Sequence, residues 1–108
     1  MGGRPTSAID TTASQESVGM TQQQVEITNR LGLHARAAAK LVHTANAFQA
    51  QVFVGTGEEE VNAKSILGLL TLAATKGTPL TVRAEGDDEE AAVRAVVALF
   101  EDRFGEGE

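Results

Sequence analysis

The chain has 108 residues, with nine Lys and Arg against fifteen Asp and Glu, so its formal net charge is -6. This length supports one small domain with a two-layer core and argues against a self-sufficient multi-substrate enzyme. The acidic balance argues against nucleic acid as a partner. The absence of Cys removes disulfides, thiol catalysis and zinc-thiolate sites, and two His make a catalytic metal improbable. We expect no metal and no bound cofactor.

Three segments are expected along the chain. Residues 1–20 are rich in Gly, Ser and Thr without any helical or strand period, which predicts a disordered extension. The functional domain is expected over residues 21–104, and residues 105–108 are expected to be a frayed acidic C-terminus. No stretch approaches the roughly 20 apolar residues that span a bilayer, and no signal peptide is visible. We therefore expect a cytoplasmic protein without membrane insertion.

The first predicted elements are a strand and a helix. Val25 and Ile27 alternate with polar residues from Gln24 onward, which predicts a half-buried strand that ends before residues 29–32. Residues 35–48 are rich in Ala, and their apolar side chains recur at helical spacing. This predicted stripe consists of Ala38, Leu41, Val42, Ala45 and Phe48.

A hairpin and a short helix come next. Residues 50–54 predict a second strand, and the glycines that follow predict a turn into a third strand over residues 59–63. Residues 65–73 then predict a short helix, which Gly68 weakens. Its predicted buried stripe consists of Ile66, Leu69, Leu70 and Ala73.

The last predicted elements are a strand and the clearest helix. Residues 80–84 alternate as a fourth strand, and Asp87 and Glu90 have the spacing of an acidic capping box. The buried stripe of the helix is predicted to run through Val93, Val96, Val97, Phe100 and Phe104 to a stop at Gly105. The order βαββαβα predicts an α+β fold, in which the helices cover one face of the sheet.

The segment that contains the candidate reactive residues joins the first strand to the first helix and reads NRLGLHAR. A helix start presents unpaired N–H groups and the positive end of the helix dipole, so it favours an anion. His34 lies at that start, and Arg36 follows two residues later. Residues 21–54 carry three basic residues against one acidic residue, whereas residues 55–108 carry five against twelve. These features predict a phosphoryl acceptor, although a histidine that only caps the helix is an alternative reading.

The sequence resembles the histidine-containing phosphocarrier (HPr) family of the phosphoenolpyruvate-dependent phosphotransferase system. The resemblance rests on NRLGLHARAAAKLV, VNAKSILGLL and AATKGTPLTVRAEGDDEEAAV at matching intervals, and it covers roughly residues 22–104. It implies an open-faced β-sandwich of four antiparallel strands with three helices on one face, in agreement with the predicted element order.

The resemblance also implies residue roles. His34 matches the histidine that accepts a phosphoryl group on Nδ1 from phosphorylated enzyme I and passes it to A-type enzyme II acceptors, and Arg36 matches the arginine that stabilises that group. Ser65 matches a serine that HPr kinase/phosphorylase modifies in some bacteria, and it is also placed to cap the short helix. The patch that docks partners is matched by Ile66, Leu67 and Leu70. We expect the carrier to act as a monomer.

One departure from the family pattern lies next to the predicted acceptor. The family usually has Pro after the H-A-R triplet, and this chain has Ala37. Proline at a first-turn position fixes φ and lacks an N–H, so Ala37 is expected to reduce rigidity slightly. The N–H groups of Ala35 and Ala37 are then both candidate donors to the phosphoryl oxygens.

Two other readings of the function stay open at this point. The segments VEITNRLGLHAR and VVALFEDRFGEGE resemble the nitrogen-related branch of the family, which signals to regulatory acceptors instead of serving sugar uptake. Alternatively, the domain binds and regulates a partner without any phosphorylation. The first alternative is decided by which enzyme I paralogue phosphorylates the protein faster, and the second by whether His34→Ala leaves signalling intact.

Overall fold

The computed structural model describes residues 21–72 and 74–106. The extension predicted for residues 1–20 therefore lies outside the described residues, as do Ala73 and residues 107–108. The elements, in chain order, are β1 (Thr21–Glu26), α1 (Ala35–Asn46), β2 (Gln51–Gly55), β3 (Glu60–Asn62), α2 (Ile66–Leu72), β4 (Pro79–Glu85), α3 (Glu89–Glu101) and the 3₁₀ turn η1 (Arg103–Gly105).

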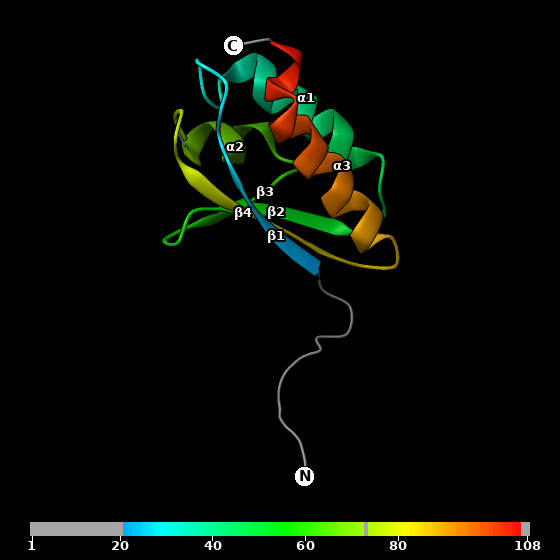
Figure 1. Ribbon diagram of the computed structural model, residues 1–108. Helices are drawn as coiled ribbons and strands as arrows, with labels where there is room; N and C mark the ends of the chain where they lie inside the picture. The colour runs from blue at the N-terminus through cyan, green and yellow to red at the C-terminus, as the bar shows by residue number, and fades with distance from the viewer. Residues whose placement is uncertain (1–20, 73, 107–108) are drawn as a thin grey trace.

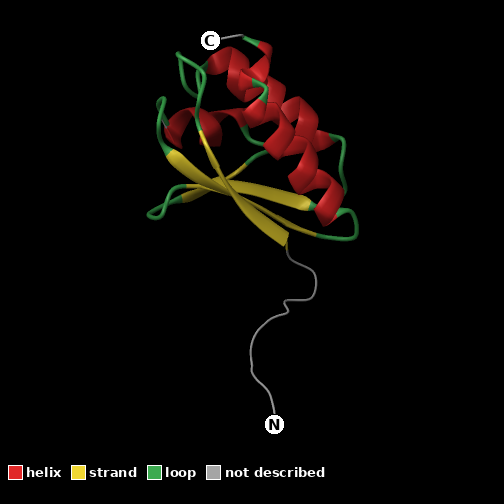
Figure 2. Ribbon diagram, in the orientation of Figure 1, coloured by secondary structure: helices red, strands yellow, loops and turns green. Residues whose placement is uncertain are grey.

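The four strands form one antiparallel sheet in the order β1-β4-β2-β3. Figure 1 and Figure 2 show the three helices on one face of this sheet, and no helix within residues 21–72 and 74–106 lies over the other face. The predicted α+β fold, with helices on one face of a four-stranded antiparallel sheet, is confirmed. The strand order itself was not predicted, because it depends on pairings between segments far apart in the chain.

The sheet buries the apolar side of each alternating strand. In β4, Leu80, Val82 and Ala84 are buried, and the residues between them are partly or fully exposed. The edge strand β1 begins at Thr21, three residues before the predicted start, and pairs along its whole length with β4. The added residues are polar, so no hydrophobic alternation in the sequence predicts them as strand; backbone pairing with β4 extends the strand over them.

The core lies between the sheet and the helices. Helix α1 contributes Ala37, Ala38, Leu41 and Ala45 to it, so the predicted stripe is buried apart from the half-buried Val42 and Phe48, which pack against it. The α3 stripe is buried as predicted, but the helix ends at Glu101 and does not continue to Gly105, so Phe104 joins the stripe from η1. The rings of Phe100 and Phe104 meet edge to face with centroids 5.1 Å apart.

The buried face of α2 differs from the prediction. Leu69 and Leu72 are buried, whereas Ile66 and Leu70 are exposed, so two of the four predicted stripe residues face solvent. A seven-residue helix offers only two turns, and the register in which it docks decides which positions are covered. The sequence spacing alone fits both the predicted buried face and the observed one.

The predicted capping box at α3 is not formed. Asp88 occupies the N-cap position, but its side chain makes no cap hydrogen bond. Its carboxylate instead accepts hydrogen bonds from the backbone N–H groups of Gln49 and Ala50 at 2.9 and 2.8 Å. Asp88 therefore ties the start of α3 to the segment that leads into β2, a long-range contact that competes with local capping.

Candidate functional site

The loop between β1 and α1 positions His34 at the N-cap of α1. Gly32 has a φ of +69°, and a Cβ at this position would lie 2.7 Å from the carbonyl oxygen of Ala74. Only glycine combines this backbone conformation with so close an approach. The next residue, Leu33, is buried and donates its N–H to the Ala74 carbonyl at 2.9 Å. These contacts fix the loop one residue before His34.

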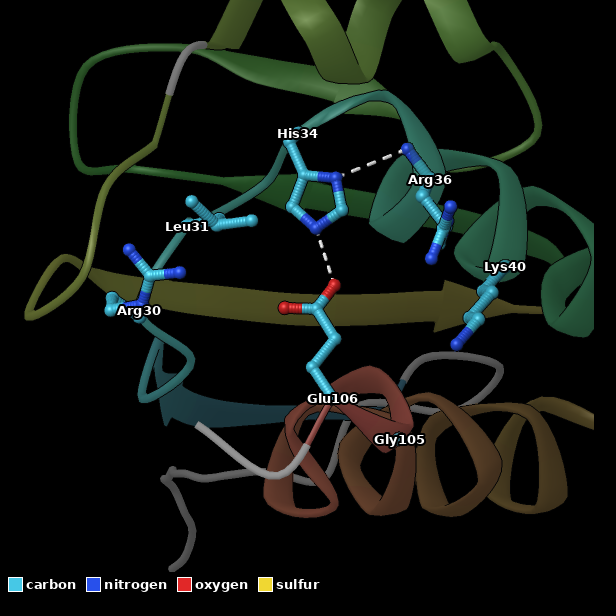
Figure 3. A pocket seen from close by; sticks show the side chains of 7 residues that line it. All are labelled: Arg30, Leu31, His34, Arg36, Lys40, Gly105 and Glu106. Carbon is cyan, nitrogen blue, oxygen red and sulfur yellow. Dashed lines mark hydrogen bonds and ion pairs between the residues drawn. The ribbon is translucent and has the colours of Figure 1, made fainter.

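His34 lies in a pocket of about 600 Å³ at the start of α1. Figure 3 shows the side chains around its ring. The pocket is lined by three basic residues, one exposed leucine and two residues of the C-terminal turn, together with His34 itself: Arg30, Leu31, His34, Arg36, Lys40, Gly105 and Glu106. The structure thus places His34 and Arg36 in one site, as expected from the sequence.

The two ring nitrogens of His34 have different partners. Nδ1 accepts a hydrogen bond from the backbone N–H of Arg36 at 3.2 Å, so the ring caps the helix that it begins. Nε2 pairs with the carboxylate oxygen Oε2 of Glu106 (Figure 3). Nδ1 therefore faces the unpaired N–H groups and positive dipole end of α1, which is where an anion would be held.

The cap position of His34 gives the N–H groups of the first turn different roles. The Arg36 N–H is bonded to His34 Nδ1, and the Ala38 N–H closes the first intrahelical bond on the His34 carbonyl at 2.8 Å. Ala35 and Ala37 occupy the first and third helical positions, where backbone N–H groups lack intrahelical partners. The Ala37 side chain is fully buried, so only its backbone can face an anion.

Two residues of the pocket carry charges that the sequence reasoning did not assign to it. Lys40 lies one turn beyond Arg36 on α1, and its Nζ donates to the carbonyl oxygen of Phe104. Arg30 lies in the loop before Gly32. The i, i+4 spacing of Arg36 and Lys40 was available in the sequence as a signal, since such residues share one helix face.

Glu106 is the site residue that sequence reasoning placed elsewhere. Residues 105–108 were expected to fray, but Gly105 and Glu106 line the pocket. Besides pairing with His34, Glu106 accepts a hydrogen bond from Nδ2 of the buried Asn29 at 3.1 Å. Burial raises the pKa of its carboxyl, but hydrogen bonds from His34 and Asn29 and the charge of Lys40 outweigh burial, so the pKa lies below its usual value. No sequence signal ties a terminal acidic residue to a loop more than 70 residues away.

Ser65 precedes α2 and caps it. Its Oγ accepts a hydrogen bond from the Gly68 N–H at 3.1 Å, and its carbonyl accepts from the Leu69 N–H. The cap role predicted for Ser65 is therefore present in the structure. It does not line the pocket around His34.

The apolar residues that the resemblance assigns to docking are exposed on α2. Leu67 keeps 74% of its surface exposed, and Ile66 and Leu70 keep 40% and 38%. Leu31, in the His34 pocket, is exposed to 56%. These four are the exposed large apolar residues of the described chain, and α2 packs against α1, whose start carries the pocket.

Among residues 21–72 and 74–106, no group of three or more His, Asp or Glu side chains is arranged to hold a metal ion. Within the same described residues, no helix has the length and apolar character needed to cross a bilayer.

Comparison with known proteins gives one consistent family. The family model described as "PTS HPr component phosphorylation site" matches residues 21–102. A phosphocarrier protein HPr of Xylella fastidiosa is 51% identical over 87 residues, covering 81% of this chain and 98% of that protein. A phosphocarrier protein NPr of Shewanella violacea is 44% identical over 85 residues, covering 79% and 93% of the two chains. The crystal structure of HPr-C-His from Thermoanaerobacter tengcongensis superposes with a TM-score of 0.77 at 46% identity, covering 80% and 97%.

Proposed function

Since the chain belongs to the HPr family of phosphocarrier proteins of the phosphotransferase system, we propose that Nδ1 of His34 accepts a phosphoryl group from phosphorylated enzyme I. His34 then passes the group to a downstream A-type enzyme II acceptor. The observation that carries this proposal is the place of Nδ1 against the first turn of α1, in a pocket that Arg36 and Lys40 also line.

The chemistry of the transfer follows from the surroundings of the ring. A neutral imidazole attacks phosphorus through the unprotonated nitrogen, and the incoming phosphoryl oxygens then meet the helix N–H groups. The N–H of Arg36 is already within 3.2 Å of Nδ1, and those of Ala35 and Ala37 lie in the same turn. The Arg36 guanidinium supplies a charge of opposite sign with paired donors. The protein contributes a nucleophile and an anion site, and its partners contribute the remaining catalytic groups.

The exposed α2 patch of Ile66, Leu67 and Leu70 supports a docking role toward enzyme I and the acceptor. Apolar side chains that protrude from a small monomeric domain are costly to leave in water unless a partner covers them. Ser65 lies at the start of the same helix. A phosphate added there by an HPr kinase/phosphorylase would place negative charge beside the patch and weaken docking to an acidic surface. We expect the free carrier to be monomeric.

The experiment measures the intact mass of the protein after incubation with enzyme I, phosphoenolpyruvate and Mg²⁺. The proposal predicts one acid-labile phosphoryl adduct on the wild type and none on His34→Ala. His43→Ala is the matched control, because His43 is an exposed histidine of the same helix outside the pocket. An adduct that survives in His34→Ala, or none with any enzyme I paralogue of the source organism, would contradict the proposal.

The nitrogen-related branch is a second candidate, favoured by the 44% identity to a phosphocarrier protein NPr. The same assay separates the branches when it compares the sugar-system and nitrogen-system paralogues of enzyme I. Faster phosphorylation by the nitrogen-system paralogue would assign the carrier to regulation, and faster phosphorylation by the other would assign it to sugar uptake.

A further inference from the structure

The carboxylate of Glu106 is held between the side chains of Asn29 and His34, which belong to the loop that leads into α1. Oε2 pairs with Nε2 of His34, and Oε1 accepts the hydrogen bond from Nδ2 of Asn29 at 3.1 Å. The Glu106 side chain keeps 17% of its surface exposed and that of His34 keeps 26%. Both oxygens of the carboxylate are thus engaged by residues of the site.

Asn29 is itself fixed in place. It is the buried polar residue of the described core, with no exposed surface. Its Nδ2 donates both to Glu106 and to the carbonyl oxygen of Gly32 at 2.7 Å. Because both partners of Nδ2 are acceptors, the amide has one consistent orientation. The donor that faces Glu106 is therefore the Nδ2 group of Asn29 and not its carbonyl oxygen.

The C-terminal turn that carries Glu106 is built from an unusual backbone. Arg103, Phe104 and Gly105 have φ values of 54°, 55° and 76°. Non-glycine residues keep such a conformation only where the surroundings hold them in it. Here the Phe104 ring is buried against Phe100, and Lys40 donates to the Phe104 carbonyl. The fold thus maintains a strained turn whose result is the placement of Glu106 beside His34.

The two neighbours of the ring select the same protonation pattern. With its pKa held below the usual value, the Glu106 carboxyl is ionised at neutral pH and can only accept hydrogen bonds. Nε2 of His34 must then carry the hydrogen of their contact. The Arg36 N–H can only donate, so Nδ1 must present its lone pair. The neutral tautomer with hydrogen on Nε2 satisfies both contacts, and the other neutral tautomer satisfies neither.

We propose that Glu106 is a positioning residue for phosphoryl transfer. It holds His34 in the tautomer whose Nδ1 can attack phosphorus, and it balances the positive charge that the ring gains. The inference rests on the proposed role of His34 as the acceptor.

The step balances without a further reactant. The Nδ1 lone pair forms the N–P bond while the bond between phosphorus and the donor group of enzyme I breaks, and the electron pair of that bond returns to the donor group. The hydrogen on Nε2 stays in place, so the phosphorylated ring carries a positive charge next to the Glu106 carboxylate. A carboxylate hydrogen-bonded to the distal nitrogen of a reacting imidazole stabilises that charge and fixes the ring.

A carboxylate in a basic pocket could instead exclude a phosphoryl group by charge. The geometry favours positioning, because Glu106 lies at Nε2 and the start of α1 lies at Nδ1, on the other side of the ring (Figure 3). The two roles predict opposite effects of removing the charge. Exclusion predicts faster phosphorylation, and positioning predicts slower phosphorylation.

The test compares the full-length wild type with Glu106→Gln, Glu106→Asp and Glu101→Gln. Glu101 is an exposed glutamate on α3, so its variant removes one carboxylate without touching the pocket. We expect Glu106→Gln to slow phosphorylation by enzyme I at least about tenfold, Glu106→Asp to restore part of the rate, and Glu101→Gln to match the wild type. Circular dichroism and the thermal midpoint of each variant show that the fold is retained.

A second readout is nitrogen NMR of the His34 ring in the unphosphorylated proteins. The wild type should show the tautomer with hydrogen on Nε2. In Glu106→Gln both tautomers should appear, because an amide can donate as well as accept. Unchanged tautomer and rate in Glu106→Gln would overturn the inference, as would a faster rate. If His34 of the wild type is never phosphorylated, the proposed function itself is refuted, whatever the Glu106 variants show.

Discussion

The backbone N–H of Arg36 donates to Nδ1 of His34 at 3.2 Å, so the predicted nucleophile is also the cap of its own helix. In the proposed transfer, the two roles of this nitrogen are successive. In the free protein the lone pair stabilises the helix start, and during transfer the same lone pair would attack phosphorus, which leaves the N–H available to a phosphoryl oxygen. The readings of His34 as a cap and as an acceptor therefore describe one geometry.

Replacing Arg36 with Lys should slow phosphorylation of His34 about tenfold, which corresponds to about 1.4 kcal/mol in the barrier. Lys keeps the charge but loses the planar pair of donors that matches phosphoryl oxygens. The rate with enzyme I and phosphoenolpyruvate is the measurement. Arg94→Lys, at an exposed position on α3, is the matched control. An Arg36→Lys rate equal to that of the control would show that charge alone suffices.

Replacing Ala37 with Pro should change the phosphorylation rate by less than about tenfold, or about 1.4 kcal/mol in the barrier. Proline suits a first-turn position, and it removes one N–H while Arg36 and the Ala35 N–H remain as donors. The same assay measures the effect. A larger increase would mean that the residue at this position limits the carrier, and a larger decrease would make the Ala37 N–H a principal phosphoryl donor.

Replacing Gly32 with Ala should lower the free energy of unfolding by about 1–3 kcal/mol. The new Cβ would meet the Ala74 carbonyl oxygen at 2.7 Å in a backbone conformation that L residues avoid. Urea denaturation measures the change. Gly57→Ala serves as the control, because a Cβ there meets no atom within 4 Å, and it should change stability by less than about 0.5 kcal/mol. Equal effects of the two substitutions would refute this account of the loop.

Neighbouring leucines of α2 should separate docking from stability. Leu67 is 74% exposed and Leu69 is fully buried. Leu67→Ser should weaken binding to enzyme I by about 1 kcal/mol or more and leave the unfolding transition nearly unchanged. Leu69→Ala should cost about 2–5 kcal/mol of stability. Titration calorimetry with enzyme I and denaturant melts measure the two effects. Unchanged binding in Leu67→Ser would remove Leu67 from the docking surface.

Acid should destabilise the link between α3 and β2. Hydrogen bonds from the backbone N–H groups of Gln49 and Ala50, of which that of Gln49 has the larger effect, hold the pKa of the Asp88 carboxyl below its usual value. A lowered folded-state pKa gives stability that is present above the unfolded-state pKa and is lost as the pH falls through the folded-state pKa. The thermal midpoint of the wild type should therefore exceed that of Asp88→Asn at neutral pH, and the gap should narrow in acid. A difference in thermal midpoint that stays the same at all pH values would contradict this role of Asp88.

The sequence predicted the elements whose hydrophobic period is long, and it missed contacts that depend on distant segments. Helix α3 is visible in its own stripe of apolar residues, but its capping was not predicted correctly. The sequence pointed to Asp87 as the cap, whereas Asp88 occupies the N-cap position and its carboxylate binds the backbone before β2. Helix α2 is too short for its period to fix which leucines are covered.

The same limit applies to the site. His34 and Arg36 are two residues apart in the chain and were found together, because a helix start has its own chemistry whatever surrounds it. Glu106 reaches them only through the left-handed turn at Arg103 and Phe104. Two non-glycine residues in that conformation have no sequence signal, since the packing of the Phe104 ring and the contact of its carbonyl with Lys40 hold them there.

The central claim is that Nδ1 of His34 carries the phosphoryl group, and nitrogen NMR of the phosphorylated protein tests it most directly. The ring must first be isotopically labelled and then phosphorylated by enzyme I. The account predicts that phosphorus is bonded to Nδ1 of His34 and that Nε2 keeps its hydrogen. Phosphorus on Nε2, or on His43, would contradict it.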